Sequence, residues 1–261
     1  MKITKEKIYF HAPYRMLLAG LDRIGDKGIN CEIYVDGNAL DTYTEAEIER
    51  INSTFEKYGI RKIVHGPFLD LNPGSRDPKV QDLTLERVIS AFEFCKKIKT
   101  NHIVLHSGFD PIFYKDASEL FLKLSIPVWK EILGAAAGYK VVIALENSID
   151  PTPEIIVNLL KDLDSPYLEA CFDAAHYNSF GGQKGIWDAL EEYPRDSIGE
   201  LHLSDNKGDF DTHLALGEGN IDYKRLFREI EKRGREPILT SEPHSMEDIE
   251  KSLNYLLTLN T

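Results

Sequence analysis

Short runs of apolar residues alternate along the chain with longer segments in which apolar residues recur every three or four positions. Several short runs are continuously apolar, as in strands covered on both faces. The pattern predicts eight strands, at Ile8–Phe10, Cys31–Val35, Lys62–Val64, Ile103–Leu105, Val141–Leu145, Leu168–Phe172, Ile198–Leu203 and Pro237–Thr240. Eight strand–helix units in about 250 residues are the size of a closed barrel. We therefore predict an α/β fold, a (β/α)8 TIM barrel, with residues 1–261 as a single domain.

The segments between the predicted strands have helical spacing. Thr44 and Glu47 form a capping-box pattern that predicts the start of one helix. The segment Lys115–Gly138 contains Pro127, which predicts either two helices or one kinked helix. No Gly-x-Gly-x-x-Gly motif follows the first predicted strand, which argues against a doubly wound dinucleotide-binding sheet.

Composition and charge argue against a nucleic-acid-binding, membrane or secreted protein. The 31 Lys and Arg residues against 43 Asp and Glu residues give a net charge of −12, which disfavours non-specific binding to nucleic acid. The longest apolar run, Val141–Leu145, is far shorter than the roughly 20 residues needed to cross a bilayer. The charged start of the chain does not resemble a signal peptide, and Cys31, Cys95 and Cys171 are odd in number within apolar segments. We expect a cytoplasmic protein with reduced thiols and no membrane partner, and the oligomeric state stays open.

Six potential metal ligands stand at or next to the ends of successive predicted strands. They are His65, His106, Glu146, Asp173, His202 and Glu242. The parallel strands of a barrel point their C-terminal ends to one face, so these side chains should converge there. Clustered carboxylates repel one another unless a cation lies between them, and imidazole with carboxylate is the ligand set of zinc, manganese, iron or cobalt. The sequence therefore predicts a divalent-metal site at the C-terminal face of the strands.

Three more candidates lie just beyond the predicted strands. His176 comes three residues after Asp173, and Asp211 and His213 stand two apart in the loop after the strand that carries His202. An Asp-x-His pair alone is weak evidence, because such pairs are usually solvated; its position after a strand with another candidate ligand gives it weight. His102 begins its strand, so we expect it at the opposite, stabilising face.

The combined motifs resemble the xylose isomerase-like barrel superfamily. The motifs are His65-Gly-Pro-Phe-Leu, Val-Leu-His106-Ser-Gly, Leu-Glu146-Asn, Phe-Asp173-Ala-Ala-His176, Leu-His202-Leu-Ser-Asp-Asn, Asp211-Thr-His213-Leu-Ala-Leu-Gly-Glu-Gly-Asn-Ile and Ser-Glu242-Pro. That superfamily includes sugar and sugar-phosphate isomerases and epimerases, and also the abasic-site nuclease endonuclease IV.

The resemblance implies one to three divalent ions, zinc or manganese. It implies three ligand sets: His65, His106 and Glu146; Glu146, Asp173, His202 and Glu242; and His176, Asp211 and His213. Single-metal epimerases need only the second set, in which Glu146 and Glu242 are also the catalytic residues that move protons.

Two functions therefore remain open. We favour a metal-dependent isomerase or epimerase of a small sugar or sugar phosphate. The alternative is an endonuclease IV-like phosphoesterase that acts on abasic DNA or a smaller phosphoester. The basic loop of the nuclease is replaced by Asp36–Asp41. The predicted mouth loops are acidic, which disfavours a nucleic-acid partner. Their acids are Asp36, Asp41, Asp70, Asp77, Asp110, Asp150 and Asp209. Phe68 and Leu69 match a Tyr–Leu pair that enters DNA in the nuclease.

Four residues are candidates for substrate contacts. His11 and His244 follow the first and last strands, and for each we weigh function and solvation evenly. Phe68 could form an apolar wall against a sugar ring, although rim aromatics usually serve packing. Lys207, like Arg76 or Lys184, could hold a phosphate or be a solvated charge. Glu32, inside the second strand, could point into the mouth or lie buried beside a cation.

Overall fold

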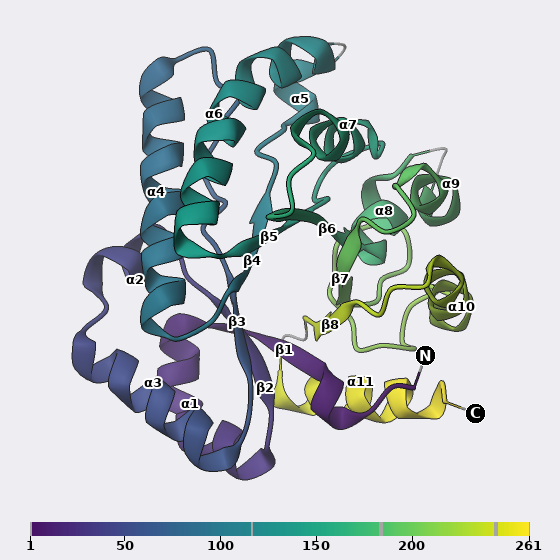
Figure 1. Cartoon of the computed structure of the whole chain (residues 1–261). Coiled ribbons are helices and arrows are strands. Elements are labelled where there is room, and N and C mark those ends of the chain that lie inside the picture. The colour runs from purple at the N-terminus through teal and green to yellow at the C-terminus, as the bar shows by residue number, and fades with distance from the viewer. Residues whose placement is uncertain (1, 116, 183–184, 243–244, 261) are drawn as a thin grey trace.

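Eight parallel strands form a closed barrel in the order β1 to β8, and β1 pairs with β8 to close it (Figure 1). The computed structural model describes residues 2–115, 117–182, 185–242 and 245–260. The strands are β1 (Ile8–Pro13), β2 (Asn30–Tyr34), β3 (Lys62–His65), β4 (His102–His106), β5 (Val142–Glu146), β6 (Leu168–Asp173), β7 (Ile198–Leu203) and β8 (Ile238–Ser241). The predicted (β/α)8 TIM barrel is confirmed.

Helices surround the barrel and connect its strands (Figure 1). They are α1 (Tyr14–Lys27), α2 (Gly37–Thr42), α3 (Glu45–Tyr58), α4 (Pro78–Lys97), α5 (Pro111–Tyr114), α6 (Ser118–Tyr139), α7 (Glu154–Leu163), α8 (Ala174–Phe180), α9 (Gly185–Glu192), α10 (Tyr223–Arg233) and α11 (Met246–Thr258), after a 3-10 turn at Lys5–Lys7. The two ends of the chain lie side by side, since Asn260 exchanges hydrogen bonds with the backbone of Ile3.

Local sequence signals account for several helix boundaries. The capping box at Thr44 and Glu47 is formed at the start of α3, as predicted. Of the two alternatives for the segment with Pro127, the single helix is present: α6 continues through the proline. Among the described residues, no helix has the length and apolarity that a membrane crossing requires.

Alternation along the strands separates two cores. The larger core lies between strands and helices and takes the outward residues of β4, Ile103 and Leu105. Between them, Val104 belongs to a small cluster with Ala144 and Cys171, which turns to the barrel interior. Polar side chains also fill that interior: Glu32, Glu200 and His202 are fully buried there.

The strands that carry candidate ligands extend further than the apolar runs predicted. β3, β4, β5 and β6 end at His65, His106, Glu146 and Asp173 themselves, one residue beyond each run. Strand pairing therefore sets neighbours: His106 is in register with Glu146, and Asp173 with His202. Apolarity alone misses these boundaries, because each strand continues into the polar residues that it positions at the mouth.

Candidate metal centre

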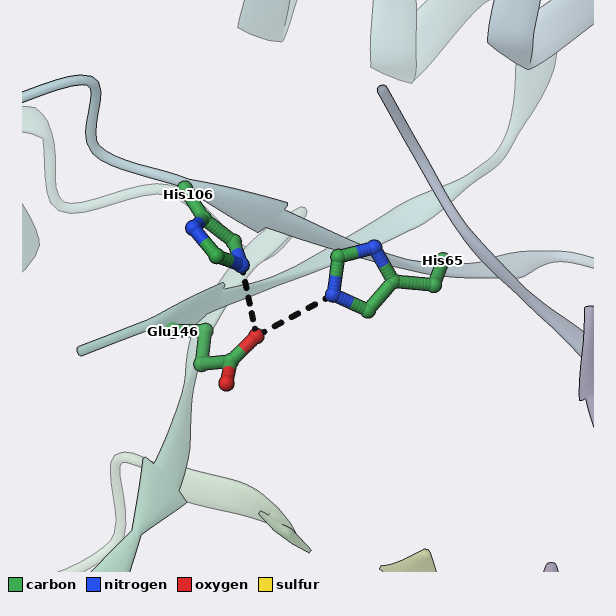
Figure 2. A group of neighbouring side chains, drawn as sticks. All are labelled: His65, His106 and Glu146. Carbon is green, nitrogen blue, oxygen red and sulfur yellow. Dashed lines mark hydrogen bonds and ion pairs between the residues drawn. The ribbon is translucent and has the colours of Figure 1, made fainter. Parts of the chain in front are cut away.

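The first group of potential ligands consists of His65, His106 and Glu146, from the ends of β3, β4 and β5 (Figure 2). Oε2 of Glu146 lies 3.2 Å from Nε2 of His65 and 3.0 Å from Nε2 of His106. Phe68 stacks on His106 with 4.4 Å between ring centroids. Two imidazoles therefore converge on one oxygen of a buried carboxylate, as the sequence predicts.

The second group consists of Glu146, Asp173, His202 and Glu242, whose ligand atoms all lie within 4.8 Å of one another. Nδ1 of His202 faces Oε1 of Glu146 at 3.1 Å and Oε1 of Glu242 at 3.3 Å, yet makes no hydrogen bond. Oδ2 of Asp173 is also buried without a hydrogen-bond partner. Unpaired buried groups of this kind are costly, so this donor set fits a divalent cation.

The third group consists of His176, Asp211 and His213. Oδ2 of Asp211 lies 3.3 Å from Nε2 of His176 and 3.1 Å from Nε2 of His213. The other carboxylate oxygen, Oδ1, is buried and has no hydrogen-bond partner. Each group contains imidazole and carboxylate, and Glu146 is shared by the first two. The structure thus brings together all nine residues that the sequence predicts as ligands.

Asn147 links the ends of β5 and β6. Its side-chain amide donates to the carbonyl of Asp173 and accepts from the backbone N–H of Asp173, both at 2.9 Å. Its own carbonyl lies 2.7 Å from Nδ1 of His176. These bonds orient Asp173 and leave Nε2 of His176 facing Asp211.

Asp205 holds the loop that carries the third group. It is fully buried, and its side chain accepts from the backbone N–H of Gly217 at 2.9 Å. Its backbone pairs with Leu214 in both directions, which closes the loop around Asp211 and His213. A Cβ at Gly219 would overlap Oδ1 of Asp205, so this close approach requires glycine.

Neither Asn147 nor Asp205 was singled out from the sequence as a site residue. The available signals were position, one and three residues after a candidate ligand, and membership of the motifs Leu-Glu146-Asn and Leu-His202-Leu-Ser-Asp-Asn.

In the metal-free protein, several candidate ligands have shifted pKa values, and two of them, Asp173 and His213, hold their protons more tightly than usual. Burial alone would raise the pKa of Glu146, but the charges of His202 and His106 hold it well below its usual value. Burial raises the pKa of Asp173 to about 6. Burial opposes a charged ring at His213, yet the hydrogen bond to Asp211 and the charge of Glu242 raise its pKa to about 9. Metal binding must displace such protons.

A cavity of about 660 Å³ opens onto the three groups. It is lined by His11 and Phe68, two of the predicted substrate contacts, and by Tyr34, Ser148 and both candidate catalytic glutamates. Lys207 and Arg76 are exposed and do not line this cavity. The predictions for His244 and Lys184 fall outside the described residues.

Some of the acidic residues predicted around the mouth cap helices, and others are exposed or buried without capping one. Asp36, Asp77 and Asp110 accept backbone N–H groups at the starts of α2, α4 and α5. Asp41 pairs with Arg87 and remains exposed, whereas Asp150 is buried. Helix capping thus explains part of the acidity, as is usual for this residue type.

A closed parallel barrel with clustered acid and imidazole groups at the C-terminal ends of its strands defines the class of barrel proteins that keep their chemistry at that face. The family model described as xylose isomerase-like TIM barrel matches residues 23–259, and the chain belongs to this family. The resemblance inferred from the motifs is confirmed.

Several known proteins are similar to this chain. A solved D-tagatose 3-epimerase-like protein is 27% identical, with a TM-score of 0.82 and 96% of both chains covered. The TTHB071 protein from Thermus thermophilus, solved after soaking with ZnCl2, is 28% identical, with a TM-score of 0.77 and 97% of both chains covered. A protein of Persephonella marina named "Probable endonuclease 4" is 23% identical over 76% of this chain and 75% of its own length.

Proposed function

We propose that this protein is a divalent-metal-dependent isomerase or epimerase of a small sugar. The observation that carries this proposal is the second group, in which Glu146 and Glu242 both face Nδ1 of His202 and both line the cavity. Two carboxylates beside one ligand cluster are what a reaction needs when a proton must leave one carbon and another must be delivered. The similarity to a D-tagatose 3-epimerase-like protein supports the same reaction class.

The cavity favours a compact and uncharged substrate. Its volume of about 660 Å³ lies within the range of small-molecule sites. Arg23, on α1, is the one Lys or Arg among its described lining residues. A phosphate would therefore find few basic groups at the mouth, so we propose an unphosphorylated sugar ahead of a sugar phosphate.

The residues of the second group and Phe68 would have different roles in the reaction. Glu146, Asp173, His202 and Glu242 would hold the ion. When bound, that ion supplies the Lewis acidity that polarises a carbonyl and acidifies the adjacent C–H. In the metal-free protein, charged neighbouring imidazoles lower the pKa of both glutamates against the effect of burial. A bound cation would take over this role and keep both carboxylates ionised. One carboxylate accepts the proton from carbon, and the other delivers a proton. Phe68 would cover one face of the sugar.

Isotope exchange tests this proposal. The protein, loaded with Mn²⁺ or Zn²⁺, is incubated in D2O with a panel of ketoses and aldoses and their phosphates. We expect deuterium to enter the carbon next to the carbonyl of at least one unphosphorylated sugar, detected by mass spectrometry. Glu146→Gln in the same assay should show no exchange. Absence of exchange from every sugar, with cleavage of an abasic duplex, would contradict the proposal.

A second function is favoured by one specific observation. The third group, His176, Asp211 and His213, is assembled in full, although a single-metal epimerase does not require it. Two or three ions at a shared site could activate water and stabilise a leaving oxygen in phosphoester hydrolysis. The similarity to a protein named "Probable endonuclease 4" points the same way.

His213→Ala separates the two functions. A one-ion sugar enzyme should keep its turnover, because this residue lies outside the second group. A hydrolase that uses all three groups should lose roughly 10²-fold or more, since a ligand of a catalytic ion is gone. Metal content per purified chain, measured by mass spectrometry, gives an independent count: one exchangeable ion supports the sugar enzyme, and three tightly bound ions support the hydrolase.

A further inference from the structure

Three of the candidate imidazole ligands are oriented by backbone carbonyls. Nδ1 of His65 lies 2.9 Å from the backbone carbonyl of Gly66, and Nδ1 of His176 lies 2.7 Å from the backbone carbonyl of Asn147. Nδ1 of His213 lies 3.2 Å from the backbone carbonyl of Glu242. A carbonyl only accepts, so Nδ1 donates in each case and Nε2 faces the ligand group.

His202 is held differently. Its ring is reversed, with Nδ1 facing Glu146 and Glu242, and its Nε2 lies 3.2 Å from Oε2 of Glu32. Glu32 is fully buried in the middle of β2, where Cys31 and Ile33 on either side face the outer core. The carboxylate of Glu32 therefore accepts from the ring of His202, as a backbone carbonyl accepts from each of the other three rings.

The same carboxylate contacts a second ring. Oε1 of Glu32 lies 3.2 Å from Nδ1 of His11, which lies inside β1 rather than after it and lines the cavity. Strand pairing supports this geometry, because His11 and Glu32 are in register between β1 and β2. Glu32 thus bridges a metal-ligand candidate and a cavity residue.

We propose that Glu32 is a positioning residue that holds His202 with Nε2 protonated and Nδ1 free to ligate the ion of the second group. With Nε2–H donated to Glu32, Nδ1 faces Oε1 of Glu146 and Oε1 of Glu242, so these three atoms can all ligate one cation. This inference rests on the proposed function, because it requires a metal ion at the second group. Carboxylates behind a ligating imidazole typically change metal affinity by about 10- to 100-fold.

The neighbouring carboxylate of Glu200 provides a matched control. It is as deeply buried as Glu32, but Oε1 lies 3.8 Å from Nε2 of His202, beyond hydrogen-bond distance. Its oxygens are engaged by His102 at 2.6 Å and by Thr240 at 2.5 Å. Glu200→Gln makes the same substitution in the same interior and leaves the bond between Glu32 and His202 in place.

The test is a titration of metal-free protein with Co²⁺, followed by visible absorption and by competition with a chelator. We expect one equivalent of Co²⁺ to bind about tenfold more weakly in Glu32→Gln and about 100-fold more weakly in Glu32→Leu. The other equivalents should be unaffected, because Glu32 contacts none of their rings, and His65, His176 and His213 keep their carbonyl partners. Glu200→Gln should bind Co²⁺ as the wild type does. Circular dichroism checks that each variant folds, and Glu32→Gln keeps the test decisive if the leucine variant does not.

Three results would overturn the inference. Unchanged Co²⁺ affinity in Glu32→Gln and Glu32→Leu would show that Glu32 does not position His202, and the proposed function would be unaffected. An equal loss in Glu200→Gln would show a general effect of interior charge rather than positioning. Absence of Co²⁺ binding by the wild type would overturn both this inference and the metal-dependent function.

Discussion

The two ends of the barrel both bury histidines beside acids, but they satisfy them differently. At the N-terminal end, Nε2 of His102 contacts Glu200 at 2.6 Å, and Glu169 pairs with Arg235. At the C-terminal end, Asp173, His202 and Asp211 each retain a buried polar atom without a hydrogen-bond partner. The first end is neutralised by the chain itself, and the second end fits an external cation.

This difference shows that residue type alone does not define a metal site. Glu200 accepts hydrogen bonds from His102 and Thr240, so little remains for an ion to gain there. Glu146 and Glu242 instead line an open cavity, and both face the imidazole of His202. His102 thus lies where its place at the start of a strand predicts, in a structural cluster. Substitutions at the two ends should affect different properties of the protein.

Glu146→Gln should have the largest effect, because Glu146 belongs to two ligand groups and lines the cavity. We expect turnover to fall by roughly 10³-fold or more, the range for loss of a proton-transferring group. Rates are measured on protein shown by circular dichroism to be folded. Glu169→Gln at the other end is the control and should keep its turnover. Full activity in Glu146→Gln would refute both proposed enzymatic mechanisms.

Metal removal should destabilise the protein through the C-terminal end alone. A bound ion at a thousandfold excess over its Kd contributes about 4 kcal/mol to the free energy of unfolding. For a chain of this size that corresponds to a fall in Tm of roughly 10 °C after treatment with a chelator. Differential scanning calorimetry with and without Zn²⁺ measures it. An identical Tm in both samples would contradict a tightly bound ion.

His102→Ala tests the N-terminal end in the opposite sense. It leaves Glu200 buried without its imidazole partner, and breaking such a pair costs about 3 kcal/mol. Urea unfolding should show that loss, while turnover per folded molecule and Co²⁺ affinity stay at wild-type values. A stable variant with weakened metal binding would show that the two ends are not independent.

Much of the fold and the ligand set was predictable from the sequence, because both depend on local signals. A run such as Val141–Leu145 marks a strand, and a potential ligand at each strand end is brought to one mouth by the parallel arrangement. Strand ends were less predictable, since β5 begins at Val142 and continues to Glu146.

What the sequence could not predict depends on long-range geometry. Glu32 could have faced the mouth or a cation, and only the register of β1 and β2 places it between His11 and His202. Lys207 follows a strand that carries a ligand, yet its loop leaves it exposed and outside the cavity lining. Sequence spacing sets which strand end a residue is near, but not the direction of its side chain within a loop.

The pH dependence of metal affinity compares the ligand groups at the level of a single side chain. In the metal-free protein the pKa of His213 is about 9, because Asp211 and Glu242 outweigh burial. An ion must displace this proton, so between about pH 6.5 and 9 the affinity of the third group should rise with pH. The contribution of His213 to this rise is about tenfold per pH unit.

The same proton has the opposite effect on the metal-free fold. A pKa raised from 6.5 to about 9 stabilises the folded state fully below pH 6.5, and this stabilisation is lost as pH rises to 9. Chelator competition at each pH therefore should show affinity rising while urea unfolding of the metal-free protein shows stability falling. His213→Gln should reduce both slopes. If affinity at the third group were independent of pH, His213 would not be one of its ligands.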